Sequence, residues 1–220
     1  MAEFVTLTAS DGHKFQAWWA PPQGMPRAGL VVIQEIFGVN SHIRDLTERF
    51  AREGYLAVAP SVFDRIQRGL DIGYTEADIA KGREIVGKVD WDKVIVDVDA
   101  ARMSVASLGS VGITGFCFGG SVTWVAAARL KFTAAAAYYG GAIARFAKEK
   151  PACPIICHFG KQDANIPLPM VDEIKAAQPQ VPIFLYDAGH GFSCDQRASF
   201  NQAAHDEAWK RTLAHFMKFL

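Results

Sequence analysis

A short glycine-bounded turn between a strand-like and a helix-like segment constrains this chain more than any other feature. The turn has the sequence GFCFGG at residues 115–120. The apolar run at 111–114 predicts a buried strand, and the run at 121–129 predicts a helix. A strand, a sharp turn and a helix in this order place the side chain of Cys117 at a helix N-terminus. The flanking glycines allow the close backbone approach that such a turn needs.

Short apolar runs alternate with helical patterns along the rest of the sequence. Strands are expected at 4–7, 14–19, 28–34, 55–59, 111–114, 133–139, 154–159 and 181–186. Helices are expected at 41–54, 76–89, 91–106, 121–129 and in the C-terminal segment around 209–220. This alternation predicts an α/β fold with a mostly parallel central sheet and helices on both faces. Because the 220 residues contain no repeat and no linker, we expect a single domain spanning 1–220.

Composition limits the partners of the chain. Lys and Arg total 23 and Asp and Glu total 23, so no basic excess points to nucleic acid or to an anionic membrane. The N-terminus lacks a signal-peptide pattern, and no apolar run approaches the ~20 residues that cross a bilayer. The four cysteines do not predict a disulfide framework in a chain of this kind. We expect a cytoplasmic protein, a monomer or a small homo-oligomer, that binds a small molecule.

Two further residues that could take part in catalysis follow the last two predicted strands. Asp163 lies in the loop after the strand at 154–159, and His190 lies in the loop after the strand at 181–186. Taken singly, each is more often an ordinary loop residue, and Cys117 could be a structural cysteine. The order cysteine, aspartate, histidine is, however, the order of nucleophile, acid and base in the α/β-hydrolase fold. His190 would take the thiol proton, and Asp163 would orient the imidazole.

The remaining histidines do not form a convincing metal site. They are His13, His42, His158, His205 and His215, and no two have the spacing of metal ligands. His158 lies inside an apolar strand, where a core histidine with satisfied hydrogen bonds is the more common case. We therefore predict no metal and no other cofactor.

Four motifs together resemble those of the dienelactone hydrolase (carboxymethylenebutenolidase) family, across nearly the whole chain. They are QEIFGVN at 34–40, GFCFGG at 115–120, GKQD at 160–163 and AGHGF at 188–192. The resemblance implies an enzyme that hydrolyses carboxylic ester or lactone bonds through an acyl-enzyme intermediate. Its small-molecule substrate would be attacked by a cysteine, and no cofactor would take part.

The resemblance also assigns roles to individual residues. It implies that Cys117, His190 and Asp163 form a catalytic triad and that Glu35 partners the thiol in the resting enzyme. The oxyanion hole would consist of backbone N–H groups, those of Ile36 and Phe118. The N–H of Phe118 is also expected there from its place at the helix N-terminus. From the residues alone, Glu35 would as readily cap a loop or pair with an arginine.

The substrate-binding residues are where this sequence departs from the family pattern. The family binds the substrate carboxylate with two arginines; Cys194 occupies one of these positions, and no arginine falls at the other. Arg83, Lys81 and Arg197 are the candidates to replace them. Aromatic residues expected near the site are Phe37, Tyr139 and Phe192, together with Phe118 and Tyr138.

These departures leave other functions open. One is an esterase or thioesterase that acts on a different small substrate. A protein on the same fold that binds a small ligand without hydrolysing it is a second alternative. A third is a redox-responsive thiol protein in which Cys194 forms a disulfide with Cys117.

Overall fold

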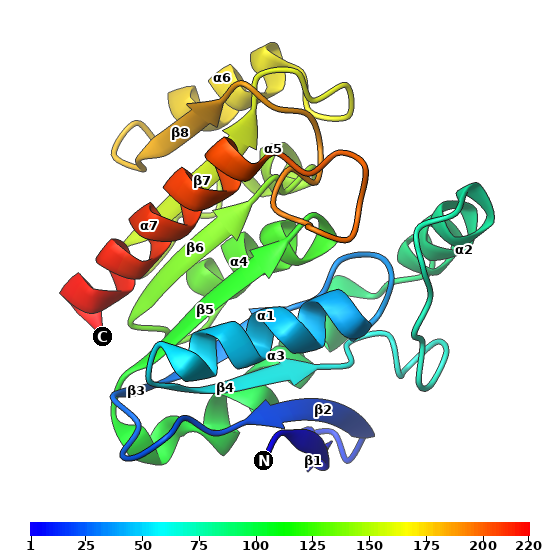
Figure 1. The fold of residues 1–220 in the computed structure, drawn as a ribbon, viewed down its shortest axis with the longest axis vertical. Coiled ribbons are helices and arrows are strands. Elements are labelled where there is room, and N and C mark those ends of the chain that lie inside the picture. Colours follow the sequence, from blue (N-terminus) through cyan, green and yellow to red (C-terminus); the bar gives the residue numbers. More distant parts are fainter. The chain divides into compact units, whose positions relative to one another are not determined.

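The computed structural model describes all residues from 1 to 220. The chain divides into two compact units, Met1–Ile113 and Thr114–Leu220. In Figure 1 the first unit runs from blue to green and the second from green to red. The single domain expected from the sequence stays a prediction.

Four strands form the sheet of unit 1. They are β1 (Glu3–Thr8), β2 (Lys14–Ala20), β3 (Ala28–Ile33) and β4 (Tyr55–Pro60), in the order β1-β2-β4-β3. The first two strands pair antiparallel from Glu3↔Trp19 to Thr8↔Lys14, around a turn in which Gly12 has a φ of 84°. Strands β3 and β4 are parallel. Every residue of β3 is buried, as its unbroken apolar sequence predicts.

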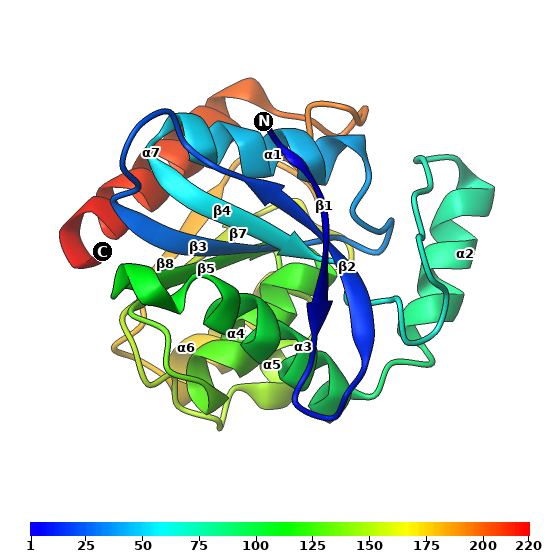
Figure 2. The same ribbon diagram turned by 90° about the horizontal axis from the view of Figure 1, so that it is seen from below.

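The helices of unit 1 are α1 (Ser41–Arg52), α2 (Glu76–Val86) and α3 (Trp91–Ser104), followed by the short 3₁₀ helix η1 (Ala106–Leu108). Figure 2 shows α1 and α3 on opposite faces of the strands. The Asn40 side chain caps α1 by accepting the N–H of Ile43 at 3.3 Å, and Ser41 is the first helical residue. Helix α2 ends three residues earlier than predicted, because Gly87 forms its C-cap.

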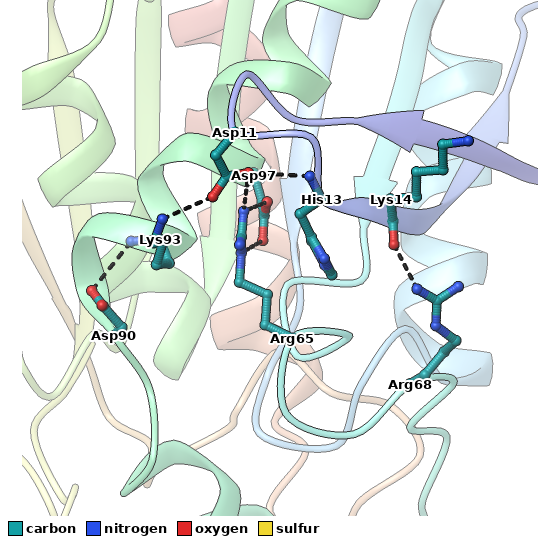
Figure 3. Close-up of polar contacts among 8 residues, drawn as sticks. All are labelled: Asp11, His13, Lys14, Arg65, Arg68, Asp90, Lys93 and Asp97. Carbon is teal, nitrogen blue, oxygen red and sulfur yellow. Dashed lines mark hydrogen bonds and ion pairs between the residues drawn. The ribbon is translucent and has the colours of Figure 1, made fainter.

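A polar cluster in unit 1 joins the β1–β2 turn to α3 (Figure 3). Asp11 in the turn accepts hydrogen bonds from Arg65 at 3.0 Å and Lys93 at 2.9 Å. Arg65 also binds both carboxylate oxygens of Asp97 on α3, at 2.8 and 2.7 Å. The hydrogen bonds from Arg65 and Lys93 hold the pKa of Asp11 well below its usual range. Because the Asp97 side chain is only 1% exposed, Arg65 is the cation that allows this carboxylate to be buried.

The strands of unit 2 are β5 (Val111–Phe116), which begins just before the unit boundary, β6 (Ala134–Tyr138), β7 (Ile155–Gly160) and β8 (Ile183–Tyr186). Their order is β5-β6-β7-β8, and both β6/β7 and β7/β8 are parallel pairs. The helices are α4 (Phe118–Arg129), α5 (Ile143–Phe146), α6 (Leu168–Ala177) and α7 (Gln202–Phe219). Helices α5 and α6 were not predicted from the sequence.

Helices cover both faces of the unit 2 strands. Helix α7 lies on one face, and α4, α5 and α6 lie on the other (Figures 1 and 2). The parallel strands and the two helical layers confirm the predicted α/β fold class. In neither unit is any helix both long enough and apolar enough to cross a membrane.

Candidate active site

Cys117 lies in the predicted sharp turn between β5 and α4. Its φ of 56° and ψ of −114° belong to a region that residues with a Cβ rarely adopt, at a cost of ~1–3 kcal/mol. The turn packs against the end of β6, where the Cys117 N–H donates to the carbonyl of Tyr138 at 3.0 Å. A Cβ on Gly120 would lie 2.2 Å from that same carbonyl oxygen. Only glycine therefore fits beside this strand end. A Cβ on Gly115 would lie 2.2 Å from the Gly119 oxygen, so the close backbone approach predicted for the glycines flanking Cys117 is observed at Gly115.

The structure brings together the three residues that the sequence singled out. His190 Nε2 lies 3.1 Å from Cys117 Sγ, and His190 Nδ1 lies 2.7 Å from Asp163 Oδ2. The other carboxylate oxygen, Asp163 Oδ1, accepts the backbone N–H groups of Asn165 at 2.8 Å and Ile166 at 3.2 Å. Sequence reasoning missed these two donors, although Asp163-Ala-Asn165 has the spacing of an Asx turn. Asp163 is thus oriented from both sides.

Two loops carry the acid and the histidine, and they are hydrogen-bonded to each other. After β7, the N–H of Lys161 donates to the carbonyl of Tyr186 at 2.8 Å, and the N–H of Gln162 donates to that of Ala188 at 3.0 Å. At Gly160 the loops approach so closely that a Cβ would lie 2.3 Å from the oxygen of Ala188. Two neighbouring parallel strands therefore deliver Asp163 and His190 to the same edge of the sheet.

The protonation of His190 follows from its partners. Burial by itself would lower the pKa of the imidazole, but the hydrogen bonds and negative charges of Asp163 and Cys117 outweigh burial and raise the pKa of His190 to about 10. A protonated imidazole donates from both ring nitrogens, which suits a carboxylate on one side and a thiolate on the other. The geometry can therefore hold a thiolate–imidazolium pair.

Aromatic side chains border His190, as predicted. Tyr139 follows β6 with a φ of 36°, and its ring meets the ring of His190 edge-on at 5.2 Å between centroids. The ring of Phe192 lies 5.2 Å from that of Tyr139. Phe118 occupies the first position of α4 and is buried. Of the predicted aromatic residues, Tyr138 points elsewhere, toward α7, where its hydroxyl lies 2.7 Å from Thr212 Oγ1.

Other predicted site residues belong to unit 1. Glu35 and Phe37 are buried in the segment after β3, where the ring of Phe37 meets that of Tyr74 edge-on at 4.7 Å. Ile36 contacts α2, because a Cβ on Gly82 would lie 2.7 Å from the Ile36 oxygen. Arg83 is the next residue along α2, so within unit 1 this helix lies beside the QEIFGVN motif at 34–40. The roles of Glu35, Ile36, Phe37 and Arg83 beside Cys117 stay predictions.

Two other cysteines and one other histidine of unit 2, Cys157, Cys194 and His158, lie in its buried core. All four cysteines are free thiols, and Cys157 and Cys194 are fully buried. His158 is also fully buried with both ring nitrogens hydrogen-bonded, as expected for a core histidine. Within either unit taken alone, no three His, Cys, Asp or Glu side chains bring ligand atoms together for a metal ion. The expectation that no metal or cofactor is needed stays a prediction.

Comparison with known proteins decides the family. The model of the dienelactone hydrolase family matches residues 15–220. The chain belongs to the dienelactone hydrolase family. It is 38% identical over 202 residues to the "Putative carboxymethylenebutenolidase" of Synechocystis sp., covering 83% of this chain and 82% of that relative. The carboxymethylenebutenolidase of Pseudomonas putida is 29% identical over 224 residues, covering 97% and 95% of the two chains.

Solved structures agree with this membership of the dienelactone hydrolase family. A "Putative Dienelactone Hydrolase" from Klebsiella pneumoniae has a TM-score of 0.89 and 31% identity, covering 100% of this chain and 99% of that chain. An alpha-beta serine hydrolase homologue from Coxiella burnetii, at 16% identity and a TM-score of 0.67, covers 98% and 97% and shares the fold. These likenesses confirm the predicted α/β-hydrolase fold. The protein is a dienelactone hydrolase-like enzyme.

Proposed function

We propose that this protein hydrolyses carboxylic ester or lactone bonds with Cys117 as the nucleophile. The observation that carries the proposal is the unbroken hydrogen-bonded line from Cys117 Sγ through His190 to Asp163, with separations of 3.1 and 2.7 Å. All three residues lie in unit 2, so their geometry is independent of the other unit. Nucleophile, base and orienting acid in this order are the parts that covalent acyl transfer needs.

The reaction has two steps, formation of the acyl-enzyme and its hydrolysis. The Cys117 thiolate attacks the carbonyl carbon, and the electron pair of the C=O double bond moves to oxygen. The N–H of Phe118 and the N-terminus of α4 stabilise that oxyanion. When the C=O bond re-forms, the C–O bond to the leaving oxygen breaks and His190 supplies its proton. Neutral His190 then takes a proton from water, whose oxygen attacks the thioester and releases the acid and the thiolate.

Further roles complete the proposal. Glu35 partners the thiol at rest, Ile36 supplies the second oxyanion donor, and Phe37, Tyr139, Phe192 and Arg83 contact the substrate. No cofactor takes part. The free cysteines suit a reducing compartment, which supports a cytoplasmic location. The protein acts as a monomer or a small homo-oligomer.

The test compares wild type with Cys117→Ala on p-nitrophenyl acetate and on cis- and trans-dienelactone. Cys153→Ala is the matched control, because Cys153 is a partly exposed thiol that precedes β7, at the opposite end of that strand from Asp163. We expect Cys117→Ala to lose at least about 10⁴-fold in kcat/KM and Cys153→Ala to match wild type. Equal activity in wild type and Cys117→Ala would overturn the proposal.

An esterase for substrates without a carboxylate is the second candidate, favoured by the buried Cys194 in place of a family arginine. Arg197 offers a cation nearby, since a Cβ on Gly191 would lie 2.7 Å from its guanidinium. If Arg197 binds a substrate carboxylate, Arg197→Met raises KM for dienelactone and not for p-nitrophenyl acetate. Turnover of the simple ester alone, unaffected by Arg197→Met, favours the second candidate.

A further inference from the structure

A buried chain of hydrogen bonds lies on the α7 side of the unit 2 strands. His158 Nδ1 lies 2.8 Å from the hydroxyl of Tyr186, and His158 Nε2 lies 3.1 Å from Thr212 Oγ1. Thr212 Oγ1 lies 2.7 Å from the hydroxyl of Tyr138. We call these four residues the His158 network. They join β6, β7 and β8 to α7, whose place on this face is visible in Figure 1.

His158 is neutral in this setting. Burial, helped by the positive charges of Arg211 and His215, lowers the pKa of His158 to about 3. Arg211 also donates to the hydroxyl of Tyr186 at 3.2 Å, so a second cation here would be repelled. A neutral imidazole has one donor and one acceptor, and each faces a hydroxyl that can take the complementary part. The network therefore holds without charge across the neutral pH range.

The network reaches the ends of β6 and β8, whose carbonyl groups are hydrogen-bonded to the segments that carry Cys117 and Asp163. Tyr138 is the last residue of β6, and its carbonyl accepts the N–H of Cys117. Tyr186 is the last residue of β8, and its carbonyl accepts the N–H of Lys161, which starts the loop to Asp163. The carbonyl of His158 accepts the N–H of Tyr139 at 2.7 Å, and the Tyr139 ring contacts His190.

An apolar core would fill this space without desolvating polar groups. Burying an imidazole and three hydroxyls costs free energy that hydrogen bonds only offset. Hydrogen bonds are directional, however, whereas apolar packing tolerates sliding. Catalytic groups must be held to within about 0.5 Å, so fixing the strand ends has a clear benefit for the Cys117–His190 contact.

We propose that His158 is a positioning residue, which sets the geometry of Cys117, His190 and Asp163 by fixing the ends of β6 and β8 through Tyr138, Thr212 and Tyr186. The proposal rests on the function proposed above. It goes further in assigning a role to a residue that does not touch the substrate.

Thr212→Val and Thr212→Ser form the matched pair that tests this role. Valine keeps the shape of Thr212 and removes the hydroxyl shared by His158 and Tyr138, whereas serine keeps the hydroxyl. We expect Thr212→Val to lower kcat on p-nitrophenyl acetate about 10-fold or more, with little change in KM. We also expect it to shift the His190 pKa, followed by NMR of the imidazole, from about 10 toward its ordinary value. Thr212→Ser should retain both properties.

Two results overturn the proposal. One is a folded Thr212→Val protein with wild-type kcat and an unchanged His190 titration. The other is equal impairment in Thr212→Ser and Thr212→Val, which would show that the hydroxyl group of residue 212 does not maintain the site. Should Thr212→Val fail to fold, Tyr186→Phe removes the hydroxyl at the less deeply buried end of the network and is read by the same criteria. The NMR titration needs no turnover, so an inactive wild type would refute the proposed function while this measurement still decides the role of His158.

Discussion

At Cys117 a costly backbone conformation and a specific side-chain contact occur in the same residue. Its φ of 56° is one of only two positive values among the non-glycine residues, and its Sγ lies 3.1 Å from His190 Nε2. The other positive value belongs to Tyr139, whose ring contacts His190. Both strained residues therefore flank the same imidazole, which is the distribution expected where the fold holds strain for function.

Replacement of Asp163 tests how the imidazole is held. In Asp163→Asn the side chain can no longer offer two negatively charged oxygens, one to His190 Nδ1 and one to the loop N–H groups. We expect kcat to fall roughly 10³- to 10⁴-fold, as when a triad loses the group that sets its tautomer. Asn165→Ala is the control, because Asn165 contributes only its backbone N–H. Steady-state kinetics in which both variants match wild type would contradict this role.

The raised pKa of His190 has a consequence for stability. A folded-state pKa of about 10, above the ordinary ~6.5, means that the charged imidazole stabilises the fold fully below pH ~6.5. That stabilisation is lost as the pH rises through 10. Urea unfolding of wild type and Asp163→Asn should therefore differ by on the order of 2 kcal/mol near neutral pH, and the difference should shrink toward pH 10. A difference that grows with pH would contradict this sign.

At the scale of elements, the contact between α4 and β6 positions the turn that carries Cys117. Gly120→Ala would place a Cβ 2.2 Å from the Tyr138 oxygen, so the backbone would have to move. We expect a loss of about 2 kcal/mol in unfolding free energy and slower turnover. Gly141→Ala is the matched control, since its Cβ would meet only the Ile166 side chain, at 3.8 Å. Equal stability of the two variants would argue against a tight fit at Gly120.

The Arg65 cluster links the β1–β2 turn to α3 in unit 1. Arg65→Met leaves Asp97 buried without its cation, and we expect this to cost about 3 kcal/mol. Lys93→Met removes only an exposed partner of Asp11, with the Lys93 side chain 48% exposed, and should cost little. Thermal melts of the two variants give the comparison. A melting temperature of Arg65→Met equal to that of Lys93→Met would contradict the account.

The sequence predicted those elements whose pattern is local. Strand β3 and the turn at Cys117 are each predicted by a run of consecutive residues. Asp163 and His190 are predicted because each follows a predicted strand. Helix α6 was not predicted because its apolar pattern is weak, with only Val171 and Ile174 buried, and because prolines occupy its N-terminal positions. The His158 network escaped for another reason. Its hydrogen bonds join residues 28 to 74 positions apart, which no local pattern records.

At the scale of the whole molecule, the family match and the triad geometry are two different observations that support the same function. The family model spans residues 15–220 and so includes parts of both units, whereas the triad geometry lies in unit 2 alone. The resemblance implies Glu35 and Ile36 in unit 1 as further parts of the site, and Arg83 is a candidate to replace an arginine of the family pattern. The unit 2 geometry stands without them, so the proposal that Cys117 carries the acyl group depends on unit 2 alone.

Intact-mass spectrometry during turnover tests that claim most directly. The purified protein is mixed with p-nitrophenyl acetate, quenched in acid within the first turnovers, and digested to locate any adduct. We expect one acetyl group on Cys117, absent from Cys117→Ala and unchanged in Cys153→Ala. Turnover without any adduct on Cys117, or acetylation of another residue that keeps pace with turnover, would contradict the claim.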